Sequence, residues 1–258
     1  MVLCVVNQKG GVGKTTTAIN LGAYLAREGL RVLLVDLDPQ GNATTGLGVN
    51  RGYVRVSTYE CLISGRSVRE AALPTELDGL DLVPSSPDLA GAEVELVEQQ
   101  GRERRLKEAL APALSRYDLV LVDCPPSLGL LTVNGLVAAD EALVPIQCEF
   151  YALDGIAQLV RTVDLVGQTL NPRLRIGAVV LTMYDGRTNL SDQVAAEVRA
   201  HFGGLVARTV IPRSVRLAEA PSHGKPIMLY DPHSKGARAY EELAREFAPK
   251  LARSRRAV

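Results

Sequence analysis

Eight residues near the N-terminus have the types and spacing that phosphate binding needs: Lys9-Gly10-Gly11-Val12-Gly13-Lys14-Thr15-Thr16. Glycines allow backbone N–H groups to turn inward and surround phosphate oxygens. The Lys14 amine can reach the β- and γ-phosphates of a nucleotide, and the Thr15 hydroxyl can ligate Mg²⁺. The motif therefore predicts a site for a nucleoside triphosphate with Mg²⁺, in which Lys9 is an extra cation beside the usual Walker A pattern.

Two acidic loops each follow a short apolar run: Asp36-Leu37-Asp38-Pro39-Gln40-Gly41-Asn42 after residues 32–35, and Asp123-Cys124-Pro125-Pro126-Ser127 after residues 119–122. A carboxylate at the carboxyl end of an expected strand, beside the glycine-rich loop, can hold Mg²⁺, directly or through water, or orient an attacking water. One aspartate alone would be read as a helix N-cap. Together with the glycine-rich loop, Asp38 and Asp123 indicate nucleotide hydrolysis, with Thr15 as a further metal ligand.

A dinucleotide site is the alternative interpretation of the glycine-rich loop. Gly11 and Gly13 supply two of the three glycines of that motif, and Asp36 follows at roughly the ribose-binding distance. Thr16, however, stands where the third glycine belongs, and neither Lys14 nor Thr15 has a role in such a site. The triphosphate interpretation is therefore favoured.

The elements that must position these loops alternate along the chain. Expected strands cover residues 2–6, 32–35, 82–83, 119–122, 142–145, 176–181 and 206–211, and expected helices cover 15–28, 87–115, 130–138, 153–170, 191–202 and 234–252. Ser57 with Glu60 and Ser67 with Glu70 have capping-box spacing, which predicts two more helix starts. We therefore expect one α/β domain over residues 1–258. We expect the fold of a P-loop NTPase, with a mostly parallel, twisted sheet that is covered by helices on both faces.

The composition is that of a globular protein: 258 residues, 47% hydrophobic and 22% charged, with 29 basic and 29 acidic side chains. This balance excludes a globally basic nucleic-acid binder. Residues 1–170 nevertheless carry 14 basic and 21 acidic side chains, whereas residues 171–258 carry 15 and 8. The asymmetry predicts one face for an anionic partner, although chance and a basic tail remain an alternative.

The sequence also indicates a compartment. It contains no apolar run of about 18 residues, no basic leader before an apolar stretch, and no Cys-x-x-Cys pair among its four cysteines. We expect a cytoplasmic protein without a membrane span.

The loops resemble the ParA/Soj family of chromosome and plasmid partitioning ATPases, within the wider MinD/ParA group with a deviant Walker A motif. The resemblance covers nearly the whole chain and continues in Leu181-Thr182-Met183-Tyr184-Asp185 and in residues 211–222. The segment Pro39-Gln40-Gly41-Asn42 favours ParA over MinD. Cys124 stands where the family often has alanine.

The resemblance implies a homodimer that sandwiches two ATP molecules with Mg²⁺. The lysine matching Lys9 would reach the nucleotide of the other subunit, Lys14 would bind the phosphates, and Asp38 would be needed for hydrolysis. Thr15, Asp38 and Asp123 would serve the metal. The resemblance also places Met183, Pro212 and Arg213 at the adenine, with simple loop packing of Met183 and Pro212 as the alternative.

The family further implies a cellular role. Its ATP-bound dimers bind double-stranded DNA without sequence preference, and Arg187 and Arg216 match DNA contacts in close relatives; ordinary surface arginines are the alternative. A ParB/Spo0J-like centromere-binding partner would stimulate an otherwise weak hydrolysis. The protein would then be associated with the nucleoid and would segregate chromosomes or plasmids.

Three rival functions stay open at the level of sequence. A MinD-like positioning ATPase would bind a membrane surface through residues 234–258, where an apolar stripe is interpreted mainly as core packing: Tyr240, Leu243, Ala244, Phe247 and Leu251. A metabolic or metal-delivery P-loop enzyme would need a substrate site, and none is evident. A nucleotide-locked scaffold would show no turnover.

Overall fold

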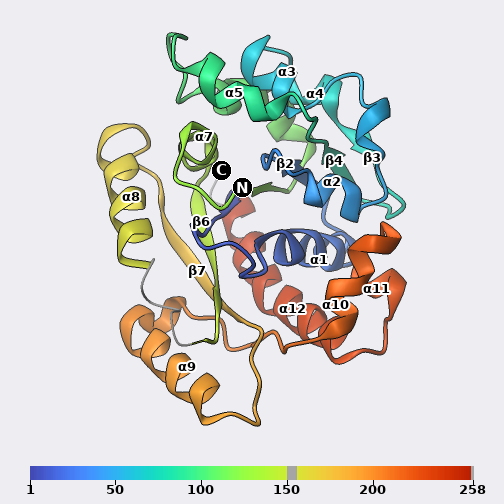
Figure 1. Ribbon diagram of the computed structural model, residues 1–258, viewed down its shortest axis with the longest axis vertical. Coiled ribbons are helices and arrows are strands. Elements are labelled where there is room, and N and C mark those ends of the chain that lie inside the picture. Colours follow the sequence, from blue (N-terminus) through green and yellow to red (C-terminus); the bar gives the residue numbers. More distant parts are fainter. Residues whose placement is uncertain (150–155, 257–258) are drawn as a thin grey trace.

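The computed structural model describes residues 1–149 and 156–256, and it places their strands in one seven-stranded sheet (Figure 1). The strand order is β3-β4-β2-β5-β1-β6-β7, and every neighbouring pair is parallel except β3 with β4. The strands are β1 (Val2–Val5), β2 (Val32–Asp36), β3 (Leu73–Pro74), β4 (Leu80–Val83), β5 (Leu119–Asp123), β6 (Glu141–Gln147) and β7 (Arg175–Thr182). The predicted α/β class with a mostly parallel sheet is confirmed.

Helices fill the connections between the strands. The longer ones are α1 (Lys14–Arg27), α5 (Leu89–Leu96), α7 (Leu130–Ala138), α8 (Ile156–Thr169), α9 (Asn189–Phe202) and α12 (Lys235–Arg256). The shorter ones are α2 (Asn42–Gly46), α3 (Thr58–Ile63), α4 (Val68–Ala71), α6 (Arg105–Leu110), α10 (Val215–Glu219) and α11 (Ile227–Tyr230). Both predicted capping boxes are present, at the starts of α3 and α4.

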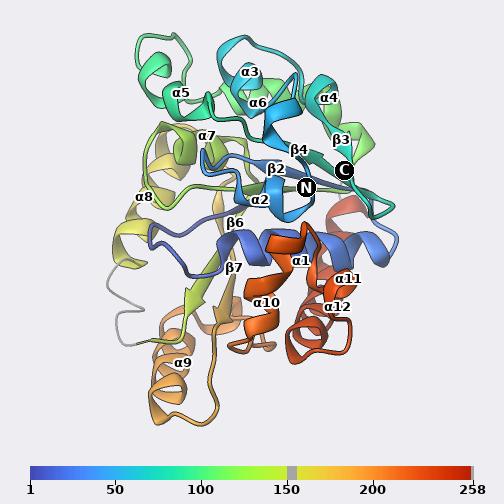
Figure 2. The ribbon, with the colours of Figure 1, turned by 45° about the vertical axis from the view of Figure 1, so that its right-hand side comes forward.

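The helices divide between the two faces of the sheet (Figures 1 and 2). One buried cluster joins the sheet to α3 through α9, for example through Leu96, Leu131 and Val198. The other joins it to α1, α11 and α12, for example through Leu21 and Leu243. Strands buried on both faces read as continuous apolar runs, which is why β1, β2 and β5 were recognisable in the sequence.

The strand order brings the chemical loops together. β5 lies between β1 and β2, so the carboxyl ends of these three parallel strands are neighbours at one edge of the sheet. The glycine-rich loop follows β1, and the two acidic loops follow β2 and β5. Ligands of open α/β sheets bind at such an edge.

Two expectations are wrong. Residues 206–211 form no strand, because the backbone N–H groups of Arg208 and Thr209 donate to the Glu246 carboxylate of α12. Isolated bridges link Val206 to Val179 of β7 and Pro212 to Tyr184, two residues beyond the end of β7. The stretch 87–115 is divided into α5 and α6, followed by a 3₁₀ turn over Ala111–Arg116. Of the helix expected over 153–170, residues 153–155 lie outside the described part of the chain.

The apolar stripe predicted near the C-terminus lies on the last helix, α12. α12 continues past Pro249, and its stripe from Tyr240 to Leu251 is buried against the sheet and α1. Core packing of this stripe is therefore confirmed. Within the described residues, no helix is both long and apolar enough to cross a membrane.

Candidate nucleotide-binding and hydrolysis site

The glycine-rich loop is shaped by two residues in left-handed backbone conformations. Gly11 has φ 74° and Gly13, the N-cap of α1, has φ 89°, a region that residues with a Cβ rarely adopt. The loop is fastened at two places: the Thr182 hydroxyl at the end of β7 donates to the Val12 carbonyl at 2.8 Å, and the Asn7 side chain accepts from the Lys9 N–H at 3.0 Å. The loop is thus held open before the N-terminus of a 14-residue helix, where anions are stabilised.

Lys14 points back into this loop. Its Nζ donates to the Lys9 carbonyl at 3.2 Å, and the side chain is buried. Burial lowers the pKa of Lys14, while the neighbouring Asp123 and Asp38 carboxylates act in the opposite direction. A desolvated ammonium group beside a cradle of N–H groups is well suited to bind phosphate.

Asp36 and Asp123 are neighbours across β2 and β5, where they are register partners. Asp36 accepts hydrogen bonds from the Thr44 N–H at 2.7 Å and the Thr44 hydroxyl at 2.6 Å. Burial, opposed by these hydrogen bonds, raises the pKa of Asp36 to about 6. Asp36 therefore anchors the start of α2, a role that the sequence did not indicate.

Asp123 is different, because both of its carboxylate oxygens are buried without a hydrogen-bond partner among the described residues. Burial raises the pKa of Asp123 well above the usual value, Asp36 adds to the shift, and the Thr15 hydroxyl and Lys14 oppose it. An orphaned buried carboxylate near a threonine hydroxyl suits a divalent cation. No set of three His, Cys, Asp or Glu side chains in the described chain forms a metal cage, so the ion would also need phosphate and water oxygens, as Mg²⁺ commonly does.

Asp38 lies at the start of the loop after β2 and is 5% exposed. Its carboxylate accepts from the Gln40 N–H at 2.9 Å, and its carbonyl accepts from the Ser85 hydroxyl at 2.8 Å. Ser85 also donates its N–H to the Thr44 hydroxyl at 2.8 Å. Ser85 and Thr44 were missed in the sequence; for Ser85 the available signal was the pair Ser85-Ser86, which follows the strand at 80–83 after a single proline.

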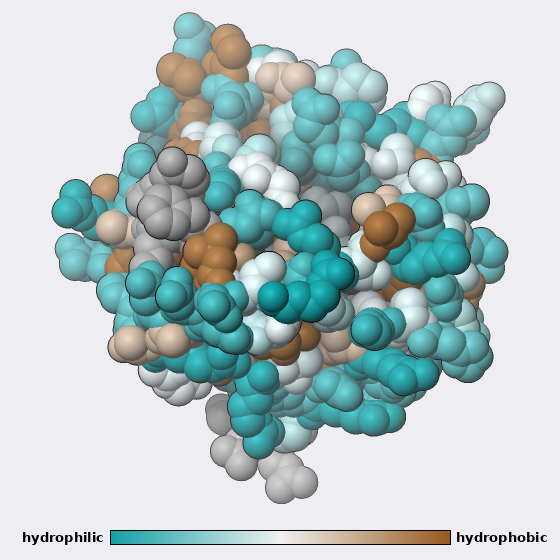
Figure 3. All heavy atoms as spheres, turned by 60° about the horizontal axis from the view of Figure 1, so that its bottom comes forward, coloured by the Kyte–Doolittle hydropathy of each residue, from teal (hydrophilic) through white to brown (hydrophobic). Residues whose placement is uncertain are grey.

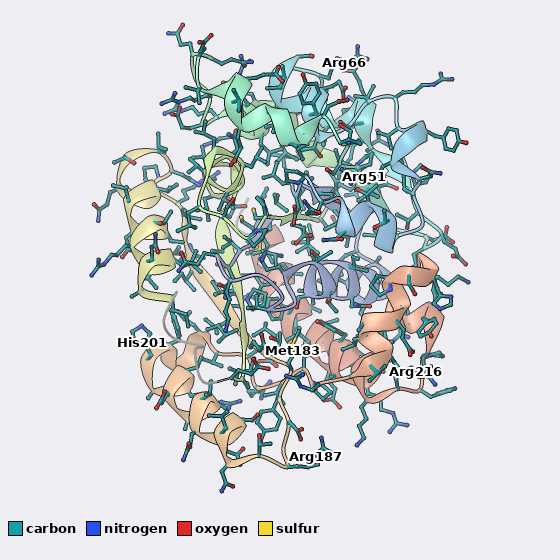
Figure 4. All side chains as sticks on the ribbon, in the orientation of Figure 1. Arg51, Arg66, Met183, Arg187, His201 and Arg216 are labelled. Carbon is teal, nitrogen blue, oxygen red and sulfur yellow. The ribbon has the colours of Figure 1, made fainter. Side chains whose placement is uncertain are left out.

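A cavity of about 330 Å³ opens beside the glycine-rich loop. It is largely apolar and is lined by residues of that loop, of the end of β7 and of α10 and α12, among them Gly13, Thr16, Met183, Pro212, Arg213 and Tyr240. Met183 has φ 50°, the left-handed conformation that is uncommon for a residue with a side chain. The structure thus brings together the three residues expected at the adenine, Met183, Pro212 and Arg213; Met183 is labelled in Figure 4.

Arg187 and Arg216 belong to different elements, the β7–α9 loop and α10 (Figure 4). The Arg187 side chain is 87% exposed and pairs with Asp185 at 2.7 Å. The Arg216 side chain is 56% exposed and pairs with Glu219 at 2.9 Å and with Asp231 at 3.5 Å. Both arginines are accessible, but acidic side chains of the same chain neutralise them.

Comparison with known proteins agrees with this geometry. A family model described as AAA domain matches residues 1–176. The chromosome partitioning protein ParA of Myxococcus xanthus is 55% identical over 95% of this chain and 87% of its own length. The sporulation initiation inhibitor protein Soj of Bacillus subtilis is also 55% identical, over 96% of this chain and 98% of its own length. The chain belongs to the ParA/Soj family of chromosome-partitioning ATPases.

Solved structures extend the comparison beyond this ParA/Soj family. Cobyrinic acid a,c-diamide synthase from Mycobacterium smegmatis, with bound ADP and magnesium, has a TM-score of 0.82 at 44% identity, covering 95% of this chain and 92% of its own. The septum site-determining protein MinD of Pyrococcus horikoshii, with Mg-ADP, has a TM-score of 0.80 at 27% identity, covering 97% of this chain and 96% of its own. The ParA and Soj relatives are more similar in sequence to this chain than either of these.

Proposed function

We propose that the protein is an ATPase that works as a switch: it binds ATP with Mg²⁺, dimerises, and changes its affinity for DNA when the nucleotide is hydrolysed. The observation that carries the proposal is the meeting of three loops at neighbouring strand ends, where the orphaned Asp123 carboxylate lies near Lys14 and Asp38. Bound Mg²⁺ would supply neutralisation of phosphate charge and fix the phosphate oxygens in place.

The residues divide the work in the proposed reaction. The backbone of residues 10–16 and the Lys14 amine bind the phosphates, and Thr15 and Asp123 hold the metal with Asp38 near it. Asp38 orients the attacking water, because its carboxylate is fixed by the Gln40 N–H at the mouth of the site. Lys9, which is half-buried at the exposed turn of Gly10 and Gly11, contributes a cation to the site of a second copy of the chain.

The cavity beside the loop would take the adenine base, since its lining is largely apolar and opens onto Gly13 and Thr16. Met183 and Pro212 would pack on the base, with Arg213 at the rim. This arrangement gives the nucleotide a single orientation across the loop.

The output of the proposed switch is reversible attachment to the nucleoid in the cytoplasm. Two copies in an ATP-bound dimer double the exposed arginines, so a chain with no net charge can bind the phosphates of arbitrary duplex DNA. A ParB/Spo0J-like partner would accelerate the weak basal hydrolysis and release the dimer. Figure 3, in which the end of the molecule that carries α9 in Figure 1 comes forward, shows a mostly hydrophilic surface with scattered apolar side chains.

The membrane-directed alternative loses its main support in the structure. A MinD-like surface helix needs an apolar face open to lipid, whereas the stripe of α12 is buried against the sheet and α1. The partition switch is therefore the better supported function.

Nucleotide binding and turnover test the proposal. We expect Lys14→Ala to lose binding of a fluorescent ATP analogue, whereas Lys107→Ala, on the exposed side of α6, binds normally. Asp38→Ala should keep binding, lose phosphate release and run as a dimer with ATP in size-exclusion chromatography with light scattering. Normal phosphate release by Asp38→Ala would refute the assigned role of this residue, and normal binding by Lys14→Ala would refute the phosphate site.

A further inference from the structure

Arg51 makes a paired contact with the turn that follows Asp38. It begins a 3₁₀ turn over Arg51–Tyr53, and its guanidinium reaches back across the chain. One terminal nitrogen donates to the Gln40 carbonyl at 2.8 Å and the other to the Pro39 carbonyl at 2.6 Å. Figure 4 shows this side chain beside α2, on the same side of the molecule as the loop after β2.

The turn is built to accept the guanidinium. Gly41 has φ 67°, and a Cβ at this position would lie 2.4 Å from the Arg51 Nε and 2.6 Å from its Cζ. The Nε itself is buried and has no hydrogen-bond partner among the described residues, so the side chain is pressed against the glycine. Within the described chain Arg51 forms no ion pair, and the two carbonyls are its polar anchors.

The same turn determines where the Asp38 carboxylate points. The Gln40 N–H donates to this carboxylate at 2.9 Å, and the Gly41 N–H donates to the Asp38 carbonyl at 2.9 Å. From the inner side, the Ser85 hydroxyl donates to the same carbonyl at 2.8 Å. Ser85 and Arg51 therefore hold different peptide groups of the turn, and within the described chain no other side chain donates to the Pro39 and Gln40 carbonyls.

We infer that Arg51 is a positioning residue for hydrolysis, which acts by fixing the peptide groups that aim Asp38. The inference rests on the proposed role of Asp38 as the residue that orients water. Hydrogen bonds from one arginine to two carbonyls are charge-assisted, and they hold both carbonyls in a fixed geometry. Because misplacement of a catalytic group by about 1 Å can slow a reaction on the order of a hundredfold, loosening this turn should lower kcat. Arg51 touches neither the glycine-rich loop nor the cavity, so KM should change little.

Steady-state phosphate release tests the inference in the full-length protein with Mg-ATP and duplex DNA. We expect Arg51→Ala to lower kcat roughly tenfold and to keep KM within about twofold of the wild-type value. Destabilisation of the fold alone would not lower kcat in this selective way. Arg51→Lys, which can reach one carbonyl at a time, should give an intermediate kcat. Arg55→Ala, an exposed arginine of the same segment, should turn over normally. Unfolding midpoints of all variants, measured in urea, show whether each one is folded.

Several results distinguish the possible failures. If Arg51→Ala has the kcat of the wild-type protein, the inference is overturned. If Arg51→Ala does not fold, a wild-type kcat in Arg51→Lys overturns the inference instead. Asp38→Ala is measured in parallel: if it keeps full turnover, both the proposed role of Asp38 and the inference fail. If Asp38→Ala is inactive while Arg51→Ala is normal, only the inference fails.

Discussion

At the scale of single residues, the candidate site contains buried polar groups that lack hydrogen-bond partners within the described chain next to buried polar groups that have them. Among the described residues, the two buried oxygens of Asp123 have no hydrogen-bond partner, and the Lys14 amine donates to the Lys9 carbonyl of the loop. Asp36 next to them accepts two hydrogen bonds from Thr44. Buried polar groups without partners cost free energy of folding, and such groups in native proteins usually have a function. In the proposed function, Asp123 and Lys14 face the ligand, whereas Asp36 supports the loop.

The orphaned carboxylate leads to a prediction on stability. Asp123→Asn removes a buried, unpaired acid, so we expect the free energy of unfolding without nucleotide to stay equal or to rise by about 1–3 kcal/mol. The additional stabilisation by Mg-ATP should largely disappear, because the amide is a poor ligand for Mg²⁺. Urea denaturation with and without Mg-ATP measures both quantities.

Asp88→Asn is the matched control for this prediction, since Asp88 is exposed just before α5 and its side chain makes no capping hydrogen bond. It should leave both values unchanged. An Asp123→Asn protein that gained as much stability from Mg-ATP as wild type would contradict the placement of the metal.

At the scale of elements, α12 is a structural support that also borders the site. Tyr240 on this helix lines the cavity, and its hydroxyl lies 3.0 Å from the Thr17 hydroxyl of α1, the helix that starts at the phosphate loop. α12 and α1 pack together with the sheet in one buried cluster. The C-terminal helix therefore holds the phosphate-binding helix in place and is not available as a separate anchor.

Substitution of Leu243 tests this role of α12. The residue is fully buried, so Leu243→Ala should lower the free energy of unfolding by about 2–5 kcal/mol. Arg238→Ala on the exposed side of the same helix should change it by less than about 0.5 kcal/mol. Denaturation in urea measures both variants. A membrane helix would be supported instead by two results together. The wild-type protein would sediment with anionic lipid vesicles, and a folded Leu243→Ala variant would not sediment with them.

The elements also show what a sequence can and cannot predict. The loops after β1, β2 and β5 were predictable because buried parallel strands are short apolar runs and their ligands lie at the carboxyl ends. The two-residue β3 is too short for any periodicity, and residues 206–211 look like a strand because the tie to Glu246, 37 and 38 residues away, is not visible in the sequence. The contact of Arg51 with Pro39 and Gln40 also depends on an irregular path of the chain, for which no local pattern exists.

At the scale of the whole molecule, the distribution of charge is consistent with the proposed switch in DNA affinity. The C-terminal third is basic although the chain is neutral, yet Arg187 and Arg216 are paired with acidic neighbours. The hydrogen bond from Arg187 lowers the pKa of Asp185 to about 2, so this pair stays charged at neutral pH. In the proposed switch, a single chain presents weak sites for phosphate, and these sites matter only when a dimer adds several of them together.

Charge changes at the β7–α9 loop and α10 test this account. Arg187→Glu or Arg216→Glu should abolish binding of the ATP-bound protein to duplex DNA while dimerisation persists. Asp185→Asn frees Arg187 from its partner and should tighten binding several-fold, as measured by fluorescence anisotropy over a range of salt concentrations. An unchanged dependence of affinity on salt in both arginine variants would remove these residues from the interface.

The central claim is that ATP turns DNA binding on, and one comparison tests it most directly. Asp38→Ala is incubated with an arbitrary duplex and either Mg-ATP or Mg-ADP, and the bound fraction is measured by anisotropy at a fixed salt concentration. Our account predicts binding with ATP and little or none with ADP. Equal binding in both states, or no binding to DNA by a dimer that forms with ATP, would contradict it.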